Sequence, residues 1–473
     1  MTSSNVNIER PLVSGRRIRR IGLINPWTGG NLGNEATISA MIANIRERIT
    51  GAEILGITLS PEAARHRLGV PGFPVGISTV NYPVFHSESS SAAAQQKEYF
   101  PRLKNALKKF PRAFGLIRSI RYSMPIRYSK PSLEVAHVLA AARVVWKLDV
   151  MIICGGGALD EFWGGAWGHP WALFKWVVLS RVNRVPLLFV SVGTSSLKRR
   201  LSRFFVGMAL YLSQYRSFRD PESKQAVKTL LHNSHDSVYP DLAFSYPFYA
   251  RPAAADFEPG GGSRLTVGVS PIAYWDPRVW PLKDAKRYAD YVNRMTEFVR
   301  WLLAEGYKVL FFTTNAPDIK TTEDILAMLA DNGVACSEIE TLPSPWELGP
   351  GELLARLCVM DLVIASRLHG VILSHLSATP VLALSYDPKV DSHMKAIGQE
   401  EHCLNIDDLT LQTLSSRFCS LRDVRQREQA HIRREASRFR YLLDLQYDRI
   451  LGPPPILQPS DLRGTPSLKV GLP

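Results

Sequence analysis

The sequence predicts an α/β protein with two domains, each built on a parallel β-sheet covered by helices. Its 473 residues exceed the size of one ordinary hydrophobic core. Short apolar runs rich in β-branched residues alternate with segments of helical apolar spacing, which is the pattern of parallel strands joined by helical crossovers. The Pro- and Gly-rich residues 251–264 separate two such alternations, and we predict that they form the interdomain linker.

The N-terminal domain is predicted over residues 20–250, after a basic tail at residues 1–19. It opens with a strand, a Gly-containing loop and a helix, which is the start of a βα unit. The expected strands are residues 20–25, 52–59, 149–154, 186–192, 215–220 and 237–244. The expected helices are residues 35–49, residues 135–147 and an amphipathic segment after residue 194.

The C-terminal domain is predicted over residues 265–423 and repeats the alternation. Its expected strands are residues 265–270, 308–313, 361–365 and 380–385, and its expected helices are residues 285–304, 323–332, 350–357 and 370–377. A long charged amphipathic helix at residues 424–451 is expected to dock back on the N-terminal half. Residues 452–473 form a Pro-rich tail.

Composition and charge limit the partners. A hydrophobic content of 45% and a charged content of 21% are typical of a soluble globular protein. The net charge of +14 favours an anionic partner, either a phosphorylated ligand, a nucleic acid or an anionic membrane surface. The sequence has no nucleic-acid recognition module, so we expect no nucleic-acid partner.

Cysteine usage and hydropathy predict a cytoplasmic protein. The five cysteines are scattered and lack C-x-x-C spacing, which argues against a zinc knuckle or a disulfide framework. The N-terminus has no apolar core of signal-peptide length, and no later run approaches the roughly 20 apolar residues of a spanning helix. Any membrane contact is therefore expected to be peripheral, on the inner face.

A basic insertion is predicted at residues 87–132. Within it, Arg102 to Lys130 contains nine Lys or Arg residues and no acidic residue, interleaved with Leu, Ile, Phe and Tyr. Such a segment suits an anionic membrane surface. A solvated insertion that packs a few aromatic side chains on its own domain explains the pattern equally well, so both interpretations stay open.

The richest candidate site follows the predicted strand 361–365. Arg367 and His369 lie beyond its C-terminal end, the edge at which open parallel sheets bind ligands. From Gly370 the pattern is helical, so backbone N–H groups near this point can also face an anion. Taken alone, the pair is explained as well by a surface cation and a hydrogen-bonded turn histidine. Lys389 follows the next strand, and Arg219 ends a strand of the first half.

Glycine-bearing loops follow two strands of the N-terminal domain. Residues 31–35 (Asn-Leu-Gly-Asn-Glu) come after the first strand, but they lack the G-x-G-x-x-G of a dinucleotide site. Three glycines, Gly155, Gly156 and Gly157, follow the strand 149–154 and allow a close backbone approach. The next loop carries Asp160, Glu161 and Trp163. Its tryptophans either stack on sugar rings or belong to the core.

Taken in order, these motifs resemble those of the polysaccharide pyruvyl transferase family. The resemblance covers roughly residues 20–400 and has one departure, Asn34, where the family usually has Asp. The matching segments are residues 31–35, 155–157, 217–220 with Ser223, 240–243, 367–370, Pro380 and 386–389.

The resemblance implies a GT-B-like fold with the ligand cleft between two Rossmann-like domains. It also implies transfer of pyruvate from phosphoenolpyruvate onto two sugar hydroxyls as a cyclic ketal, in exopolysaccharide or cell-surface glycan biosynthesis, without a cofactor or a metal. His369 becomes the expected acid/base, and Arg367, Lys389, Arg219 and Gly370 the donor-binding residues. For Arg219, a structural ion pair with Asp220 is the alternative. The expected residues on the side of the sugar or lipid-linked acceptor are Glu35, Asn34, Gly155, Gly156, Gly157, Asp160, Glu161 and Trp163.

Two other functions compete with this interpretation. A GT-B glycosyltransferase that uses a nucleotide sugar would share the two-domain fold. A non-catalytic polysaccharide- or membrane-associated protein is favoured by Asn34 but disfavoured by the intact Arg367, His369 and Lys389.

Overall fold

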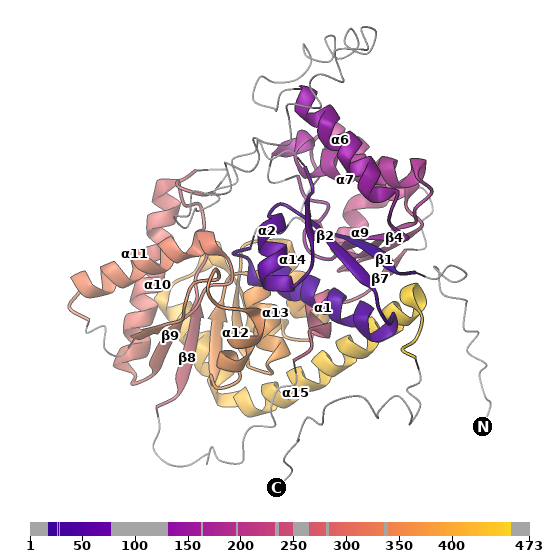
Figure 1. Ribbon diagram of the computed structural model, residues 1–473. Helices are drawn as coiled ribbons and strands as arrows, with labels where there is room; N and C mark the ends of the chain where they lie inside the picture. The colour runs from indigo at the N-terminus through magenta and orange to yellow at the C-terminus, as the bar shows by residue number, and fades with distance from the viewer. Residues whose placement is uncertain are drawn as a thin grey trace, which may run out of the picture.

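The computed structural model describes three parts of the chain. These are residues 18–76 without 26 and 28, residues 131–248 without 162–163, 195–196 and 232–235, and residues 264–455 without 281–282 and 335–338. The predicted linker, most of the basic insertion and both predicted tails, apart from a few flanking residues, lie outside these ranges. Within them the chain forms two parallel α/β domains (Figure 1).

The N-terminal domain is a seven-stranded parallel sheet in the order β3-β2-β1-β4-β5-β6-β7. Its strands are β1 (Arg20–Ile24), β2 (Glu53–Thr58), β3 (Gly72–Pro74), β4 (Val150–Cys154), β5 (Leu187–Val192), β6 (Tyr215–Phe218) and β7 (Ser237–Val238). Its helices are α1 (Leu32–Arg48), α2 (Pro61–Leu68), α6 (Pro131–Val145), α7 (His169–Val182), α8 (Arg200–Leu212) and α9 (Pro221–Val227). Every residue of β4 and β5 is buried, as expected for strands covered on both faces.

The C-terminal domain is a six-stranded parallel sheet in the order β10-β9-β8-β11-β12-β13. Its strands are β8 (Thr266–Ser270), β9 (Lys308–Phe311), β10 (Ile339–Thr341), β11 (Leu362–Ala365), β12 (Val381–Ser385) and β13 (Cys403–Asn405). The helices are α10 (Ala285–Ala304), α11 (Ile319–Asp331), α12 (Pro350–Leu357), α13 (Leu368–Leu376), α14 (Pro388–Ala396) and α15 (Leu411–Leu451). The two-domain parallel α/β fold predicted from the sequence is confirmed.

The last predicted strand of the N-terminal domain, residues 237–244, is wrong in its extent. Strand β7 ends at Val238, and a 3₁₀ turn follows at Leu242–Ser245. Pro240 has no N–H to donate to a sheet, and the Asp241 carboxylate accepts a hydrogen bond from the Ala243 N–H at 3.0 Å. The early end of the strand brings Asp241 to the carboxyl edge of the sheet.

Helix α15 begins earlier than the predicted residue 424. Thr410 caps its N-terminus, and Leu414, Phe418 and Leu421 extend the buried stripe of the helix into the C-terminal domain. At its other end, Tyr447 of α15 is buried in one hydrophobic core with residues of α1 and α13. The helix therefore packs on both domains (Figure 1).

No helix in the described part of the chain has the length and apolar character needed to cross a bilayer.

Candidate active site at the domain interface

The carboxyl ends of both sheets supply the site. Arg219 follows β6 and Asp241 follows β7, whereas His369 begins the helix after β11 and Lys389 the helix after β12. Parallel strands place these residues at one edge of each sheet. The two edges meet, because His369 Nε2 of the C-terminal domain lies 3.7 Å from Asp241 Oδ2 of the N-terminal domain.

Asp241 is the centre of this contact. Its buried Oδ2 atom also accepts a hydrogen bond from Arg219 Nη1 at 3.2 Å. Burial favours the neutral carboxyl, but His369 and Arg219 outweigh it and lower the pKa of Asp241 well below its ordinary value. An ionised carboxylate thus joins a cation of one domain to the imidazole of the other.

The His369 imidazole has one nitrogen to offer to a ligand. The 3.7 Å separation from Asp241 is longer than a hydrogen bond, so this contact is electrostatic. The Nε2 atom is buried and has no hydrogen-bond partner among the described residues. A buried polar atom without a partner is uncommon in a native fold and is expected to bind a ligand or a water.

Two glycines make room for these side chains. A β-carbon on Gly33, at the start of α1, would lie 2.0 Å from His369 Cγ. A β-carbon on Gly193, after β5, would lie 2.7 Å from Arg219 Nη2. Only glycine permits such an approach, so both backbones serve as walls of the site.

Arg219 forms the alternative ion pair and also reaches the centre of the site. Its Nε atom lies 3.3 Å from Asp220 Oδ2, as the alternative interpretation expected. Arg219 also shares Asp241 with His369. Asp241 is fixed in turn by the 3₁₀ turn Leu242–Ser245 that follows it, which packs on α1 and α15. The structural pairing and a position beside the imidazole are therefore both found.

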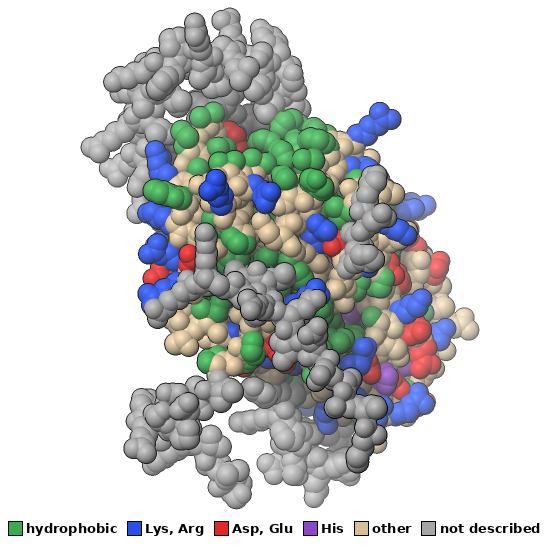
Figure 2. Space-filling view, turned by 90° about the vertical axis from the view of Figure 1, so that its right-hand side faces the viewer, with side chains coloured by type: hydrophobic (Ala, Val, Ile, Leu, Met, Phe, Trp, Pro, Cys, Tyr) green, Lys and Arg blue, Asp and Glu red, His purple; other side chains and the backbone are tan. Residues whose placement is uncertain are grey.

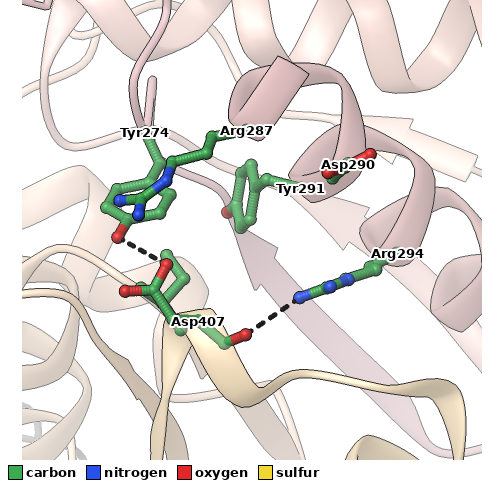
Figure 3. Close-up of a pocket in the computed structure, with 7 residues that line it drawn as sticks. Tyr274, Arg287, Asp290, Tyr291, Arg294 and Asp407 are labelled. Carbon is green, nitrogen blue, oxygen red and sulfur yellow. Dashed lines mark hydrogen bonds between the residues drawn. The ribbon is translucent and has the colours of Figure 1, made fainter. Parts of the chain in front are cut away.

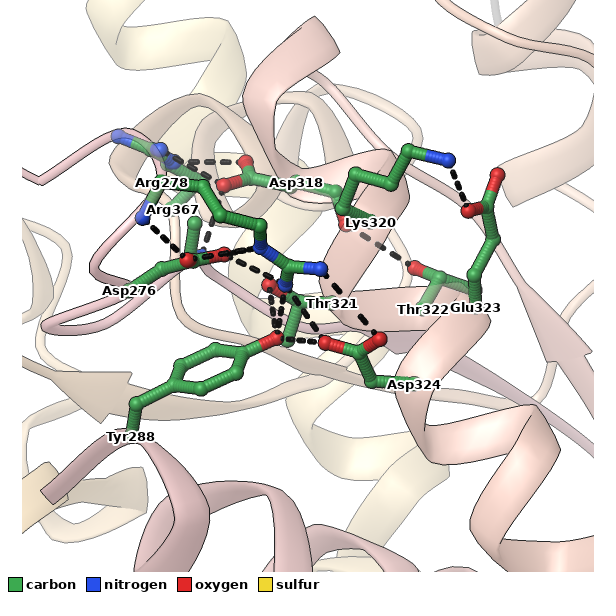
Figure 4. Close-up of polar contacts among 11 residues, drawn as sticks. Asp276, Arg278, Tyr288, Asp318, Lys320, Thr321, Thr322, Glu323, Asp324 and Arg367 are labelled. Carbon is green, nitrogen blue, oxygen red and sulfur yellow. Dashed lines mark hydrogen bonds and ion pairs between the residues drawn. The ribbon is translucent and has the colours of Figure 1, made fainter. Parts of the chain in front are cut away.

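Arg367 is held by a second buried carboxylate. Its Nε and Nη2 atoms donate to Asp318 Oδ2 and Oδ1, each at 2.7 Å (Figure 4). Asp318 is fully buried and also accepts a hydrogen bond from the Ala273 N–H at 2.9 Å. Burial opposes the charge of Arg367, but Asp318 outweighs it and raises the pKa of the guanidinium. Two of its three guanidinium nitrogens are thus occupied within the protein.

Lys389 lies near both domains. Its Nζ is 3.5 Å from Asp387 Oδ2 and stands over the ring of Tyr386, 5.3 Å from the centroid. Burial opposes the ammonium charge, while Tyr386, Asp387 and the N-terminal Asp160 outweigh it and raise the pKa of Lys389. Lys389 therefore stays charged, and the charge of Asp160 in the N-terminal domain contributes to this.

A sequence profile of the polysaccharide pyruvyl transferase family matches residues 31–388. The chain belongs to this family. The match runs from the loop before α1 to the start of α14 and includes Arg219, Asp241, Arg367 and His369, and it ends one residue before Lys389. A comparison with curated proteins gives no match.

Solved structures show the same fold at low sequence identity. The S. aureus MnaA–UDP co-structure has a TM-score of 0.51 and 9% identity, covering 93% of this chain and 100% of that one. The UDP-GlcNAc 2-epimerase from Neisseria meningitidis bound to UDP-GlcNAc has a TM-score of 0.50 and 8% identity, covering 88% of this chain and 94% of that one. These similarities establish a GT-B-like arrangement for this member of the pyruvyl transferase family.

The glycine loop of this pyruvyl transferase family member gathers part of the predicted acceptor side. Gly155 and Gly156 adopt positive φ angles of 53° and 64°. The Asn34 Oδ1 atom lies 3.1 Å from the position of a β-carbon on Gly156, and Asp160 Oδ2 lies 2.5 Å from one on Gly157. Asn34, the glycines and Asp160 therefore form one polar surface.

The other predicted site residues lie elsewhere. Glu161 accepts hydrogen bonds from the backbone N–H groups of Lys198 and Arg199, at 2.8 and 3.2 Å. Trp163 lies outside the described residues. Gly370, in the first turn of α13, packs against Ala365, since a β-carbon on Gly370 would lie 3.3 Å from the Ala365 Cβ.

Glu35 forms an interdomain contact. It accepts a hydrogen bond from Arg67 Nε at 2.8 Å, and Arg67 donates in turn to the backbone oxygens of Trp346 and Leu348 at 2.6 and 2.7 Å. Burial raises the pKa of Glu35 to about 6, against the opposing effect of Arg67. The structure thus places Glu35 in a link between α2 and the C-terminal domain.

Three further residues of the site were not predicted: Asp318 and His393, and Asp241, which belongs to the matching segment 240–243 but was given no role. His393 lies one helical turn after Lys389 on α14, a spacing that predicts a shared face. Its Nε2 lies 2.9 Å from His375 Nδ1, and its surroundings include Asp241. Burial lowers the pKa of His393 to about 4, so its imidazole is neutral.

A polar cavity of about 320 Å³ lies beside the site in the C-terminal domain (Figure 3). Its lining residues are Tyr274, Arg287, Asp290, Tyr291, Arg294, Ile406 and Asp407. The Tyr291 hydroxyl lies 3.3 Å from the Ser366 hydroxyl, immediately before Arg367. The lining includes none of the predicted site residues, so this cavity and the His369 site are separate.

One group of side chains in the described ranges has the spacing of metal ligands. It consists of Glu401, His402 and Glu428, whose ligand atoms lie within 4.8 Å of one another. Glu428 already accepts hydrogen bonds from Gln399 at 2.6 Å and from Arg427 at 2.7 Å. None of the three belongs to the predicted site.

Proposed function

We propose that this protein transfers pyruvate from phosphoenolpyruvate to two hydroxyls of a sugar, forming a cyclic ketal and releasing phosphate. The observation that carries the proposal is the buried His369 Nε2, which has no hydrogen-bond partner in the described ranges and lies beside the carboxylate that Arg219 also holds. Membership of the pyruvyl transferase family supports the same reaction.

The cations suit a small, densely negative donor. Phosphoenolpyruvate carries a phosphate and a carboxylate, so its site needs positive charges that hold the two groups apart. Arg219 of the N-terminal domain shares Asp241 with His369, and Lys389 follows a neighbouring strand of the C-terminal sheet. Arginine grips either anion through paired N–H donors, while lysine acts as a point charge. Arg367, anchored by Asp318, adds a third cation with a fixed orientation.

His369 supplies the proton that the reaction needs. In the proposed sequence, imidazolium Nε2–H donates to the C3 methylene of the donor, and one sugar hydroxyl forms a bond to C2. The neutral imidazole takes the proton of that hydroxyl. The second hydroxyl then bonds to C2 while the C2–O bond to phosphate breaks, and its proton leaves with the phosphate. Positioned proton transfer of this kind contributes about 10²–10⁴ in rate.

Asp241 positions the imidazole in this scheme. A carboxylate beside a histidine fixes the orientation of the ring. Because Arg219 also holds Asp241, the donor cation and the acid/base are oriented by one group.

We place the acceptor at the glycine loop of the N-terminal domain. Asn34 and Asp160 offer a side-chain amide and a carboxylate to sugar hydroxyls, and the three glycines let a sugar ring approach the backbone. The proposed acceptor is a sugar or lipid-linked oligosaccharide of exopolysaccharide or cell-surface glycan synthesis. The proposed reaction is cytoplasmic and uses no cofactor beyond the donor substrate.

The experiment that tests the proposal measures phosphate release from phosphoenolpyruvate with a panel of glycosides and lipid-linked sugars, with a pyruvyl mass gain on the product. His369→Ala should abolish release while the thermal unfolding curve stays unchanged. His66→Ala, an exposed histidine on α2, is the matched control and should keep wild-type activity.

A binding measurement separates this reaction from that of a nucleotide-sugar transferase. Phosphoenolpyruvate should raise the melting temperature of the wild type but not of Arg219→Gln or Lys389→Met. Stabilisation by UDP-GlcNAc in place of phosphoenolpyruvate would overturn the proposal.

A further inference from the structure

The outer surface of α6, α7 and α8 is apolar. These helices lie side by side on one face of the N-terminal sheet and share a core cluster with it. Six of the eleven large hydrophobic side chains that are exposed in the described part of the chain belong to this surface: Leu139, Trp146, Val182, Leu201, Phe204 and Tyr211. Figure 2 shows hydrophobic side chains gathered on the upper part of one face, with Lys and Arg beside them.

Helical spacing makes this apolar surface continuous. On α7, Trp171, Phe174, Val178 and Val182 follow the i, i+3, i+7, i+11 positions of one outward face. A helix that covers a sheet normally turns polar residues outward. The ring of Phe174 contacts that of Phe204 on α8, with centroids 6.2 Å apart, so the outward faces of the two helices join.

The apolar side chains of this surface are not part of the hydrophobic core, because several of them are largely exposed. Trp146, Val182 and Tyr211 are 77%, 74% and 72% exposed, and they lie at or near the C-terminal ends of three parallel helices. Because crossover helices run opposite to the strands, these ends lie toward the amino edge of the sheet, away from His369. A partner seated there leaves the catalytic edge of the domain open.

Cations predominate around this surface, and a carboxylate at its edge, Glu161, accepts hydrogen bonds from the Lys198 and Arg199 N–H groups. Helices α7 and α8 contain no Asp or Glu, and the one acidic residue of α6, Glu134, pairs with Lys175 at 2.9 Å. Exposed cations lie near the C-terminal ends of α6 and α7 at Arg143, Lys147, Arg181 and Arg184, and a second group, Lys198, Arg199 and Arg200, lies at the N-terminal end of α8. Apolar side chains with a cationic rim are complementary to an interface with an apolar interior and anionic headgroups.

We propose that the α6–α8 surface docks on an anionic lipid bilayer. Trp146, Val182, Phe204 and Tyr211 enter the headgroup region, and the rim arginines and lysines contact lipid phosphates. The association is peripheral and does not depend on the proposed reaction. The basic segment from Arg102 to Lys130 lies outside the described residues and is not part of the proposed surface.

The test is flotation of the full-length protein with vesicles of equal parts phosphatidylglycerol and phosphatidylcholine. The variant Val182→Ser/Phe204→Ser/Tyr211→Ser should bind these vesicles about tenfold more weakly, or worse, since it removes three exposed apolar side chains. Val359→Ser/Tyr441→Ser is the matched control, because both side chains are 63% exposed but lie in the C-terminal domain and on α15. The control should float like the wild type.

A second variant tests how the cationic residues contribute to vesicle binding. Arg143→Gln/Arg181→Gln/Arg184→Gln should lose the preference for phosphatidylglycerol over pure phosphatidylcholine vesicles, and added salt should weaken wild-type binding in the same way. All variants keep residues 102–130, so a loss of binding reports on the helical surface alone.

Two results would overturn the proposal. The first is a wild type that does not float, and the second is a triple serine variant that floats unchanged. If that variant also has a lowered melting temperature or a changed sedimentation coefficient, the surface is assigned to another segment of this chain or to a second copy. If the triple variant does not fold, Val182→Asp alone serves, since Val182 is 74% exposed at a helix end and a carboxylate there opposes anionic headgroups.

Discussion

Gly33 and His369 lie in direct contact across the domain interface. A β-carbon on Gly33 would fall 2.0 Å from Cγ and 2.2 Å from Nδ1 of the imidazole. The start of α1 therefore forms one wall against which the ring of the other domain rests. The position of the proposed acid/base depends on the N-terminal domain as well as on its own helix.

This contact predicts the effect of Gly33→Ala. The added methyl must displace the imidazole or separate the domains, and a misplacement of about 1 Å costs roughly 10²-fold in rate. We expect kcat for phosphate release to fall by about that factor or more. Gly207→Ala on α8 is the control, since its β-carbon would be 3.4 Å from the nearest atom. Equal kcat values for the two variants would contradict the role of Gly33.

Asp241→Asn tests the carboxylate between Arg219 and His369. Loss of its charge removes the group that orients the imidazole, so kcat/KM should fall by about 10²–10⁴. Asp236→Asn breaks another buried ion pair of the same domain, Arg216–Asp236 at 3.0 Å. That variant should lose stability and keep its kcat, which separates positioning of the catalytic group from a general loss of folding. A similar kcat in both variants would show that Asp241 is only structural.

Arg367→Lys tests the paired hydrogen bonds to Asp318. Lysine keeps the positive charge but cannot make both contacts, so the buried Asp318 loses a donor. We expect the free energy of unfolding to fall by about 1–3 kcal/mol, and KM for phosphoenolpyruvate to rise. Arg278→Lys disturbs the neighbouring pairs with Asp276 and Asp324 and should leave KM unchanged (Figure 4). Chemical denaturation and steady-state kinetics give both quantities.

Glu35 predicts a pH dependence of stability. Burial raises its pKa from 4.5 to about 6, so between these values the folded state holds more protons than the unfolded state. Stability from this group is therefore present below about pH 4.5 and is lost as the pH rises through about 6. Relative to Glu35→Gln, the free energy of unfolding of the wild type should fall by about 2 kcal/mol as the pH rises over this range.

Urea denaturation at several pH values measures the difference. The exposed Glu62→Gln on α2 should show no such pH dependence relative to the wild type. If the free energies of unfolding of the wild type and of Glu35→Gln change with pH in the same way across this range, the pKa of Glu35 is not raised.

The sheets were predictable because their residues carry a local pattern. The apolar strand 362–365 and its position in a parallel sheet were sufficient to place Arg367 and His369 at a carboxyl edge. Helix α2 was also within reach, since Ser60, Pro61 and Gly69 are ordinary helix boundary signals. The early start of α15 could have been recognised from the spacing of Leu414, Phe418 and Leu421.

The partners of the site residues were not predictable in the same way. Asp318 reaches Arg367 from the loop after β9, and Asp241 reaches His369 from another domain. Periodicity identifies faces of single elements but contains no information on how two domains are oriented. Gly33 was a local sign of close packing, but nothing in the neighbouring sequence identifies the imidazole that it contacts.

Helix α15 affects the order in which the two domains can finish folding during synthesis. Its Gln446 is fully buried in the N-terminal domain, where it accepts from the Ser191 hydroxyl at 3.0 Å and donates to the Ser217 hydroxyl at 2.5 Å. The ribosome makes β1 to β7 first, yet the buried Ser191 hydroxyl of β5 receives its hydrogen-bond acceptor, Gln446 Oε1, only when the last helix emerges. A fragment of residues 1–250 should therefore remain incompletely folded by circular dichroism until a peptide of residues 411–451 is added. The first domain to be synthesised is the last to be finished.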